Sequence, residues 1–416
     1  MASKCESIVT ELDHRRRVLL LLIALAIITF LDRISIAVAG PRIQQELHIT
    51  PERWGWVIGA FVLAYGLFEI PTGALGDRIG QRSVLTRIVL WWSAFTCLTG
   101  AAIGFPALVV TRFLFGAGEA GAYPNISGVI VRWFPVRERA RTQGFIWAAS
   151  RMGGALAPLI VVPLQATMGW RLTFVALGAT GMVWVVFWRA LYSDHPAPGT
   201  VAALHSGVPW AELLRQRQLW LIFAMYFFQA WGTTFYFGWF PTYLVKGEGF
   251  TEGEMGVFSA LPFVCGAFGN LAGGFLSDRL AARFGLKIGR RLVGSAGLAM
   301  SAILLASMTM THDKTAVVVL SSLGFGVADL MLPAAWAVCL DVGHEYAGVV
   351  TGTMNTAGQL GGFVCSVLFG YLVTAWGGYR EPLWLVAASV LLGAFLFTRI
   401  DPTRQLVSAE ARLEAQ

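Results

Sequence analysis

The chain has 416 residues, of which 56% are hydrophobic and only 13% are charged, and its formal net charge is +7. A soluble domain usually carries about 25% charged residues, so most of the surface of this protein faces something other than water. A basic chain can also be a nucleic-acid-binding protein, but this composition favours a membrane protein whose loops on one side collect Lys and Arg. We therefore expect a lipid bilayer around the protein and no nucleic-acid partner.

From its N-terminus onward, the chain is a series of apolar runs of similar length. A helix needs roughly 20 mostly apolar residues to cross a bilayer. Twelve such runs lie at about 18–39, 54–75, 84–104, 107–131, 141–164, 170–192, 217–245, 253–276, 291–310, 315–341, 349–374 and 380–398. The pattern predicts an all-α membrane protein with twelve transmembrane helices.

The distribution of Lys and Arg predicts the orientation of these helices. An even number of spans places both termini on the same side. If that side is the cytoplasm, 22 of the 31 Lys and Arg residues fall in cytoplasmic loops and tails, six in the opposite loops and three inside spans. By the positive-inside rule, we expect a multi-pass protein of a bacterial inner membrane with cytoplasmic N- and C-termini.

A repeat divides the chain into two halves. The run GALGDR at 73–78 follows the second span, and GFLSDR at 274–279 follows the eighth, the matching span of the second half. Between them, the stretch 193–216 is polar and breaks the rhythm of apolar runs. We predict two pseudo-symmetric six-helix bundles, 1–192 and 217–398, a cytoplasmic linker at 193–216 and a tail at 399–416, with a substrate path between the bundles.

These motifs carry a resemblance to a known family. The run GALGDRIGQR at 73–82 resembles the loop motif of the major facilitator superfamily, and the second copy and the two-half layout agree with it. Leu31-Asp32-Arg33, residues 119–124 (EAGAYP), 240–244 (FPTYL) and 352–363 resemble the anion:cation symporter family. That family includes bacterial galactonate, hexuronate, glucarate and phthalate transporters. The resemblance implies the major facilitator fold, mostly monomeric proteins, and uptake of a small organic anion driven by protons.

Charged residues inside the first span are candidates for function, because a charge at the bilayer centre costs about 2.5–3.5 kcal/mol or more. Arg33 lies near the middle of that span, and a guanidinium can bind a carboxylate through two parallel hydrogen bonds. The resemblance implies that Arg33 binds the substrate anion, and the alternative is a structural ion pair. Asp32 is turned about 100° around the helix from Arg33. The resemblance implies proton coupling by Asp32, whereas it could also hold Arg33 and a neighbouring helix in place.

The fourth span carries two more charges. A carboxyl group in apolar surroundings, such as that of Glu119, can change its protonation state near physiological pH, as a proton carrier must. The resemblance implies proton coupling by Glu119, and the alternative is a static hydrogen-bonded side chain. Arg112 lies seven residues earlier, about two turns, and shares roughly the same face. We expect Arg112 to act in gating or to set the proton affinity of Glu119, unless its role is structural.

Two further charged residues lie in the fifth and tenth spans. Arg151 precedes a Gly- and Pro-rich stretch, and it could pair with Glu119 or bind a second acidic group of a dianion. Asp329 could bind a proton or a substrate hydroxyl, or it could be a polar contact that packs its helix. The identity of the substrate therefore stays open among hexuronates, aldonates, aldarates, tartrate and aromatic acids.

Uncharged side chains in the spans complete the candidate site. Hydrogen bonds to substrate are expected from Tyr65, Tyr236, Asn355 and Gln359, and Asn355 and Gln359 share a helix face because they are four residues apart. Trp336 could form an apolar wall against the substrate. Ordinary helix packing is the alternative for each of them.

The repeated loops are candidates for gating. If the halves rock about a central site, ion pairs at the ends of the second and eighth spans could close the cytoplasmic side. The expected gating residues are Asp77, Arg78, Arg82, Asp278 and Arg279, with Arg112 in the fourth span.

Enzyme activity is not expected, because no catalytic nucleophile, metal-ligand spacing or cofactor motif is present. The run GAGEAG at 116–121 fits a dinucleotide fingerprint, but that motif must follow a strand and this run lies in a membrane span. No metal and no cofactor are predicted. Two other functions use the same features: export of metabolites or drugs on the same fold, and anion sensing without transport.

Overall fold

The structure is a computed structural model that describes residues 2–194, 210–343 and 346–406. The side chains of 2–13 and of five helical residues lie outside the description: Ala74, Asp77, Val136, Arg137 and Ala140. The described residues form helices and no strand, which confirms the predicted all-α fold.

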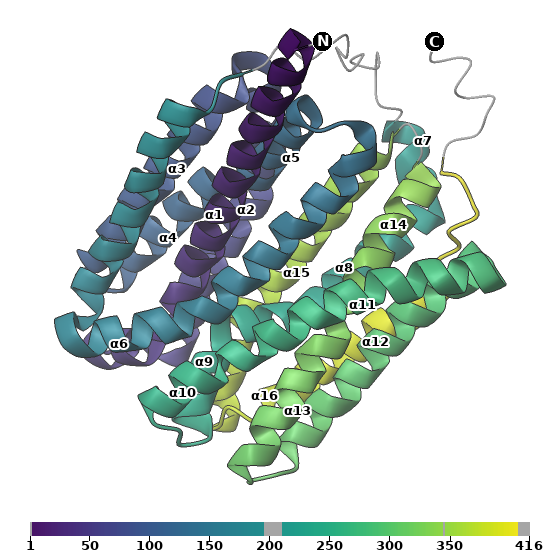
Figure 1. The fold of residues 1–416 in the computed structure, drawn as a ribbon. Helices are drawn as coiled ribbons and strands as arrows, with labels where there is room; N and C mark the ends of the chain where they lie inside the picture. Colours follow the sequence, from purple (N-terminus) through teal and green to yellow (C-terminus); the bar gives the residue numbers. More distant parts are fainter. Residues whose placement is uncertain (1, 195–209, 344–345, 407–416) are drawn as a thin grey trace.

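The first half contains six spans, which are formed by four helices and one helix pair (Figure 1). They are α1 (Ala2–Glu46), α2 (Pro51–Ile79), α3 (Gln81–Gly100), α4 (Phe105–Glu119) continued by α5 (Ala122–Trp133), and α6 (Val136–Leu191). The long α6 contributes two spans, because the backbone breaks at Gly169, whose positive φ of 77° favours glycine.

The second half repeats this plan after the short α7 (Trp210–Arg215). Its helices are α8 (Arg217–Thr234), η1 (Phe235–Trp239), α9 (Phe240–Thr242), η2 (Tyr243–Gly247), α10 (Glu252–Phe258), α11 (Ala260–Phe284), α12 (Leu286–Thr309), α13 (Lys314–Asp329), α14 (Met331–Gly343), α15 (Ala347–Trp376) and α16 (Pro382–Arg399). The repeat is visible in the turns: Gly80 after α2 and Gly285 after α11 have φ angles of 86° and 87°. The division at 193–216 stays a prediction, since 195–209 lie outside the described residues.

Eight helical stretches in the described residues are long and apolar enough to cross a membrane. One of them, Arg141–Leu191, crosses twice because of the break at Gly169. The other three spans are α3, the pair α4 and α5, and the run from α8 to η2, which is interrupted by π-helical turns. Twelve transmembrane helices result, as predicted, and α1 begins at the end of the bundle where α16 ends (Figure 1). We call this end the terminal end and the other the far end.

At the far end, side chains of the two halves contact one another directly. Arg42 of α1 donates to Glu252 of α10 at 2.6 Å, and Gln44 of α1 donates to Thr242 of α9 at 3.2 Å. The helices α2 and α15 cross closely here: a Cβ atom on Gly370 would lie 2.4 Å from the carbonyl oxygen of Pro51. The two halves are therefore packed together at the far end.

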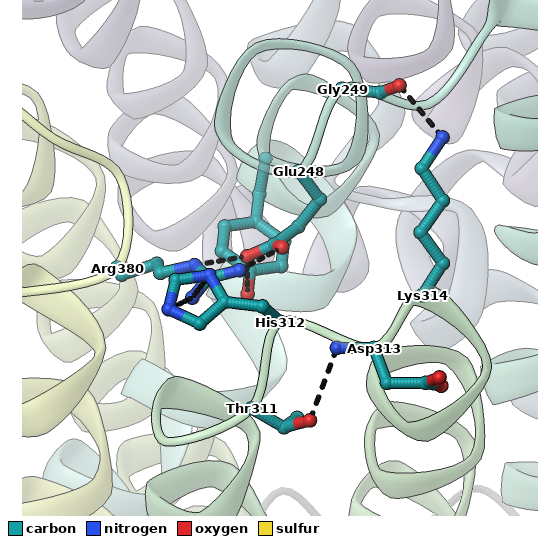
Figure 2. A network of polar contacts seen from close by, with 8 residues as sticks. Glu248, Gly249, Thr311, His312, Asp313, Lys314 and Arg380 are labelled. Carbon is teal, nitrogen blue, oxygen red and sulfur yellow. Dashed lines mark hydrogen bonds and ion pairs between the residues drawn. The ribbon is translucent and has the colours of Figure 1, made fainter.

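The loops of the second half are also tied to one another at the far end. Arg380 donates through Nε to Glu248 at 2.6 Å, and its Nη1 lies 2.6 Å from a ring nitrogen of His312 (Figure 2). Nearby, Lys314 donates to the carbonyl of Gly249 at 2.8 Å. These contacts fix three loops of one half relative to one another.

At the terminal end, the polar clusters at the repeated loops each stay within one half. Arg290 of α12 donates to Asp278 at 2.7 Å and to Asp341 at 3.2 Å, all in the second half. In the same region of α15, a Cβ atom on Gly348 or Gly352 would meet no atom within 4 Å. This part of α15 therefore has open space beside it, in contrast to its tightly packed far end.

Candidate functional site

A buried ion pair lies in the first half, between α1 and α4. Arg33 donates through Nε to Oε1 of Glu119 at 2.9 Å and through Nη2 to the same oxygen. The Glu119 side chain has no exposed surface, whereas that of Arg33 is 13% exposed. The second oxygen of Glu119 is buried and has no hydrogen-bond partner among the described residues. Arg33 and Glu119 are thus brought together, and Arg33 keeps some accessible surface.

The local sequence explains why Glu119 lies where it does. Glu119 is the last residue of α4, and α5 begins three residues later. Pro124 has no backbone N–H and cannot donate to Ala120, so the helix is interrupted at this point. A carboxylate at the C-terminal end of a helix is unfavourable with the helix dipole. The guanidinium of Arg33 compensates that charge.

Aromatic rings surround the guanidinium of Arg33. Its Cζ atom lies 4.6 Å from the ring centre of Tyr65, 5.0 Å from that of Phe30 and 5.2 Å from that of Phe61. Rings at this distance stabilise a cation through their negative faces. Tyr65, a predicted substrate-binding residue, therefore contacts Arg33, while its role in binding stays a prediction.

Asp32 and Arg112 lie behind this pair, in the interior of the first half. Both oxygens of Asp32 are buried without a hydrogen-bond partner among the described residues, and so is Nε of Arg112. Trp92 of α3 faces Asp32, and the guanidinium of Arg112 lies 4.3 Å from the ring centre of Phe115. Asp32 lies within electrostatic range of Glu119. The predicted roles of both residues remain open.

Arg151 does not pair with Glu119, which was one of the two expectations for it. Its Nη2 donates to Oδ1 of Asp329 at 2.9 Å and lies 2.8 Å from Oδ2. Glu119 is already bonded to Arg33, and Arg151 on α6 faces α13 of the other half. Arg151 therefore pairs with Asp329 instead. The pair is nearly buried, with side-chain exposures of 9% and 7%. It ties the two halves together in the middle of the bundle.

A third acidic residue was missed by the sequence analysis. Glu69 of α2 is partly buried, and Asn355 of α15 donates to its Oε2 at 2.6 Å. The signal was available, because Glu69 lies inside the apolar run 54–75 just as Glu119 lies inside another. Gln359, one turn beyond Asn355, packs against Gly66. A Cβ atom added to Gly66 would lie only 2.8 Å from the Cβ atom of Gln359. Both predicted residues of α15 therefore face α2.

The remaining predicted binding residues are more deeply packed. Tyr236 is 2% exposed, and its hydroxyl donates to the carbonyl of Ser321 at 2.9 Å. Trp336 of α14 lies 5.9 Å from Trp147 of α6, ring centre to ring centre, and thus contacts the other half. Its indole Nε1 has no hydrogen-bond partner among the described residues. Trp336 therefore lies at the interface between the halves, whereas the Tyr236 hydroxyl donates within the second half.

The predicted gating residues are only partly brought together. Asp278 pairs with Arg290, a residue not predicted, and Arg279 is exposed. In the first half, the backbone N–H of Arg82 donates to Asp194 at 3.2 Å, and Arg78 is exposed. The side chain of Asp77 lies outside the described residues. Among those residues, no group of three or more His, Cys, Asp or Glu could hold a metal ion.

Two six-helix halves with oppositely charged side chains buried between and within them define a multi-pass membrane transporter. Residues 22–366 match the Major Facilitator Superfamily. The chain belongs to this family, which confirms the resemblance, and its relatives are transporters rather than enzymes.

Several relatives match over nearly the whole chain. It is 34% identical over 410 residues to the "Probable sulfoacetate transporter SauU" of Cupriavidus necator, covering 94% of this chain and 95% of that one. It is 28% identical over 411 residues to the "Hexuronate transporter" of Bacillus subtilis, covering 96% and 97%. A third relative is the "Probable galactarate/D-glucarate transporter GarP" of Escherichia coli, 28% identical over 431 residues, covering 94% and 96%.

A solved structure supports the fold. A bacterial homolog of the human lysosomal transporter Spinster superposes with a TM-score of 0.81 over 97% of this chain and 98% of that chain. The sequence identity is 19%, so the likeness concerns the fold alone.

Proposed function

We propose that this protein is a proton-coupled transporter that imports a small organic anion by alternating access. It would work in a bacterial inner membrane with both termini in the cytoplasm, and as a monomer. The observation that carries the proposal is the Arg33–Glu119 pair: a partly accessible cation whose present partner is a fully buried carboxylate.

The energetics of this pair link anion binding to proton uptake. If a substrate carboxylate takes the place of Glu119 at Arg33, Glu119 is left as an unpaired buried charge, which costs about 3–5 kcal/mol. That cost corresponds to a loss of affinity of roughly a hundredfold to several thousandfold. A proton on Glu119 removes the charge and therefore the cost. The anion and the proton thus favour each other's binding.

The neighbours of Glu119 determine how the charge is distributed. Arg33 on α1 and Arg112 on α4 are the cations near it, and Asp32 on α1 is the nearest other carboxyl group. Tyr65 and Tyr123 face the pair from α2 and α5. Both oxygens of Asp32 are buried, and it lies within electrostatic range of Glu119, so it is a candidate for a second proton site.

Alternating access follows from the packing of the halves. With the termini in the cytoplasm, the far end faces outwards, and the contacts of Arg42 with Glu252 close that side in the present state. Opening the outer side requires these contacts to break while the terminal ends approach. We propose that Asp77, Arg78, Asp278 and Arg279 act at that end.

The names of the relatives support an organic anion as cargo. Sulfoacetate, hexuronate, galactarate, glucarate and galactonate each carry a carboxylate or sulfonate group. A guanidinium binds both kinds of group through paired N–H donors. We therefore infer that the cargo presents such a group to Arg33.

Uptake into proteoliposomes tests the proposal. The purified protein is reconstituted and offered labelled sulfoacetate, glucuronate, galactonate and galactarate with the outside more acidic than the inside. We expect at least one acid to accumulate above its outside concentration, and this accumulation to collapse when the pH gradient is abolished. Uptake that proceeds only with the reversed gradient would indicate an exporter, and binding without transport would indicate a sensor.

A further inference from the structure

A second ion pair has its carboxylate in the position that Glu119 occupies in the other half. Glu119 is the last residue of α4, in the fourth span of the first half, and Asp329 is the last residue of α13, in the fourth span of the second. Pro124 and Pro333 follow them and interrupt the two spans. Each carboxylate is paired with an arginine, Arg33 or Arg151. The two carboxylates therefore occupy corresponding places in the two halves. Their arginines do not correspond, because Arg33 lies in the first span of the same half as Glu119, whereas Arg151 comes from the fifth span of the half opposite Asp329.

Both arginines keep donors that their partners do not use. Arg151 uses only Nη2 for Asp329, and its Nε and Nη1 make no hydrogen bond among the described residues. Nη1 of Arg33 likewise makes no hydrogen bond among the described residues. The side chains of Arg151 and Arg33 are 9% and 13% exposed. Each guanidinium thus has a donor that no described residue uses, on a side chain that keeps some exposed surface.

The two guanidinium groups are linked by a short series of aromatic contacts. Phe30 lies 5.0 Å from Cζ of Arg33, Phe237 lies 5.6 Å from Cζ of Arg151, and the two ring centres are 5.9 Å apart. Tyr123 lies within electrostatic range of both arginines. Each of the two cations therefore lies against one of two aromatic rings that contact each other.

We propose that Arg151 is a second anion-binding residue, which makes a short dianion with one acidic group at each end the preferred cargo. This inference rests on the proposed function. The first acidic group replaces Glu119 at Arg33, and the second replaces Asp329 at Arg151. Both displaced carboxylates take up a proton, since either one left charged and unpaired would cost about 3–5 kcal/mol. Because Asp329 belongs to the other half, its replacement also removes a tie between α6 and α13. Binding of the dianion then breaks the Arg151–Asp329 ion pair between the halves, which helps the halves to rock relative to each other.

Two pairs of compounds test this directly, because each differs only by a carboxylate in place of a CH2OH group. They are galactarate with galactonate, and sulfoacetate with isethionate. Binding is measured by calorimetry on the wild type and on the double variant Arg151→Gln/Asp329→Asn, which removes both charges and leaves no unpaired one. We expect the wild type to bind the dianion about tenfold or more tightly than its partner, a difference of about 1.4 kcal/mol. In the double variant we expect the ratio to fall close to one through loss of dianion affinity.

A single variant separates binding from a structural role. Asp329→Asn leaves Arg151 without its competitor, so dianion affinity should rise while monoanion affinity stays unchanged. The control is Arg171→Gln, whose pair with Glu46 lies in the first half and is more exposed; it should not change the ratio. If the wild type binds both members of a pair equally, or the double variant keeps the wild-type ratio, Arg151 is not a second anion-binding residue. If none of the acids binds, the proposed function itself is contradicted.

Discussion

The guanidinium of Arg33 donates two hydrogen bonds to one oxygen of Glu119, and the other oxygen of that carboxylate is buried without a partner among the described residues. The pair is therefore neutral but not fully satisfied. Removing one member of a buried pair costs about 3–5 kcal/mol. Substitutions on the two sides should consequently have different effects on transport.

Replacing Arg33 should abolish anion binding. In Arg33→Gln the site loses its accessible cation, so we expect uptake to fall about a hundredfold or more, equivalent to about 3 kcal/mol. Arg33→Lys keeps the charge but loses the paired donors and should retain a part of the uptake. Membrane content, measured on blots, is the control, and undiminished uptake by Arg33→Gln would remove this residue from the mechanism.

Replacing Glu119 should uncouple transport from protons. Glu119→Gln resembles the protonated side chain and leaves Arg33 free to bind the anion. We expect exchange of internal for external anion to continue, while accumulation against a gradient is lost. Both are measured in the same proteoliposomes. Accumulation at the wild-type level would show that another group carries the proton.

A larger residue at Gly370 should force the far end open. A Cβ atom there would lie 2.4 Å from the carbonyl oxygen of Pro51, so Gly370→Val pushes α15 away from α2. We expect a cysteine introduced on the far-end side of the site to become more reactive towards a membrane-impermeant reagent. Gly352→Val on the same helix is the matched control, because no atom lies within 4 Å of the added Cβ. Equal reactivity in the two variants would contradict this role of the crossing.

The Arg42–Glu252 contact should contribute to closure of the far end. Arg42→Glu places two carboxylates opposite each other, which favours separation of the halves. The double variant Arg42→Glu/Glu252→Arg restores opposite charges and should recover most of the uptake. The pair is about one-third exposed, with values of 33% and 29%, so a modest effect of about 1 kcal/mol or less is expected. If the double variant does not recover uptake, the important contact of Arg42 is its hydrogen bond to the carbonyl of Gln165.

The segment after α16 should stay docked in moderately acidic solution. A hydrogen bond from Lys287, with a second from Thr403, lowers the pKa of Asp401 from 3.8 to about 2. A pKa that is lower in the folded state contributes stability above the ordinary value and loses it as the pH falls towards about 2. Amide hydrogen exchange of 400–406 should thus remain slow near pH ~4. Lys287→Gln should accelerate this hydrogen exchange. Arg283→Gln, which removes a positive charge in the last turn of the preceding helix α11, should not.

The fold was largely predictable from the sequence, because a bilayer allows few solutions. Every backbone group in lipid must be bonded within the segment, so long apolar runs must be helices. The interruptions were harder to place. The π-helical turn Phe235–Trp239 lies within the predicted span 217–245, and the turn Tyr243–Gly247 extends beyond its end. Phe237, in the first of these turns, lies against Arg151 and Phe30.

The site was predictable only as a set of residues. Charge inside a span identified Arg33, Glu119, Arg151 and Asp329, and the same signal would have identified Glu69. The pairing depends on how helices rotate and approach, which one sequence does not specify. Arg151 therefore had two possible partners or ligands on sequence grounds, and its contact with Asp329 required the arrangement of α6 and α13.

The most direct test of the account is the movement of protons that accompanies the anion. Proteoliposomes are loaded with a pH-sensitive dye, and one of the acids shown to bind the protein is added outside. The membrane potential is clamped and no pH gradient is imposed. We predict acidification of the interior on addition of the acid to wild-type protein, and none with Glu119→Gln. Anion entry without any acidification by the wild type would contradict the claim that Glu119 releases Arg33 to the cargo by taking up a proton.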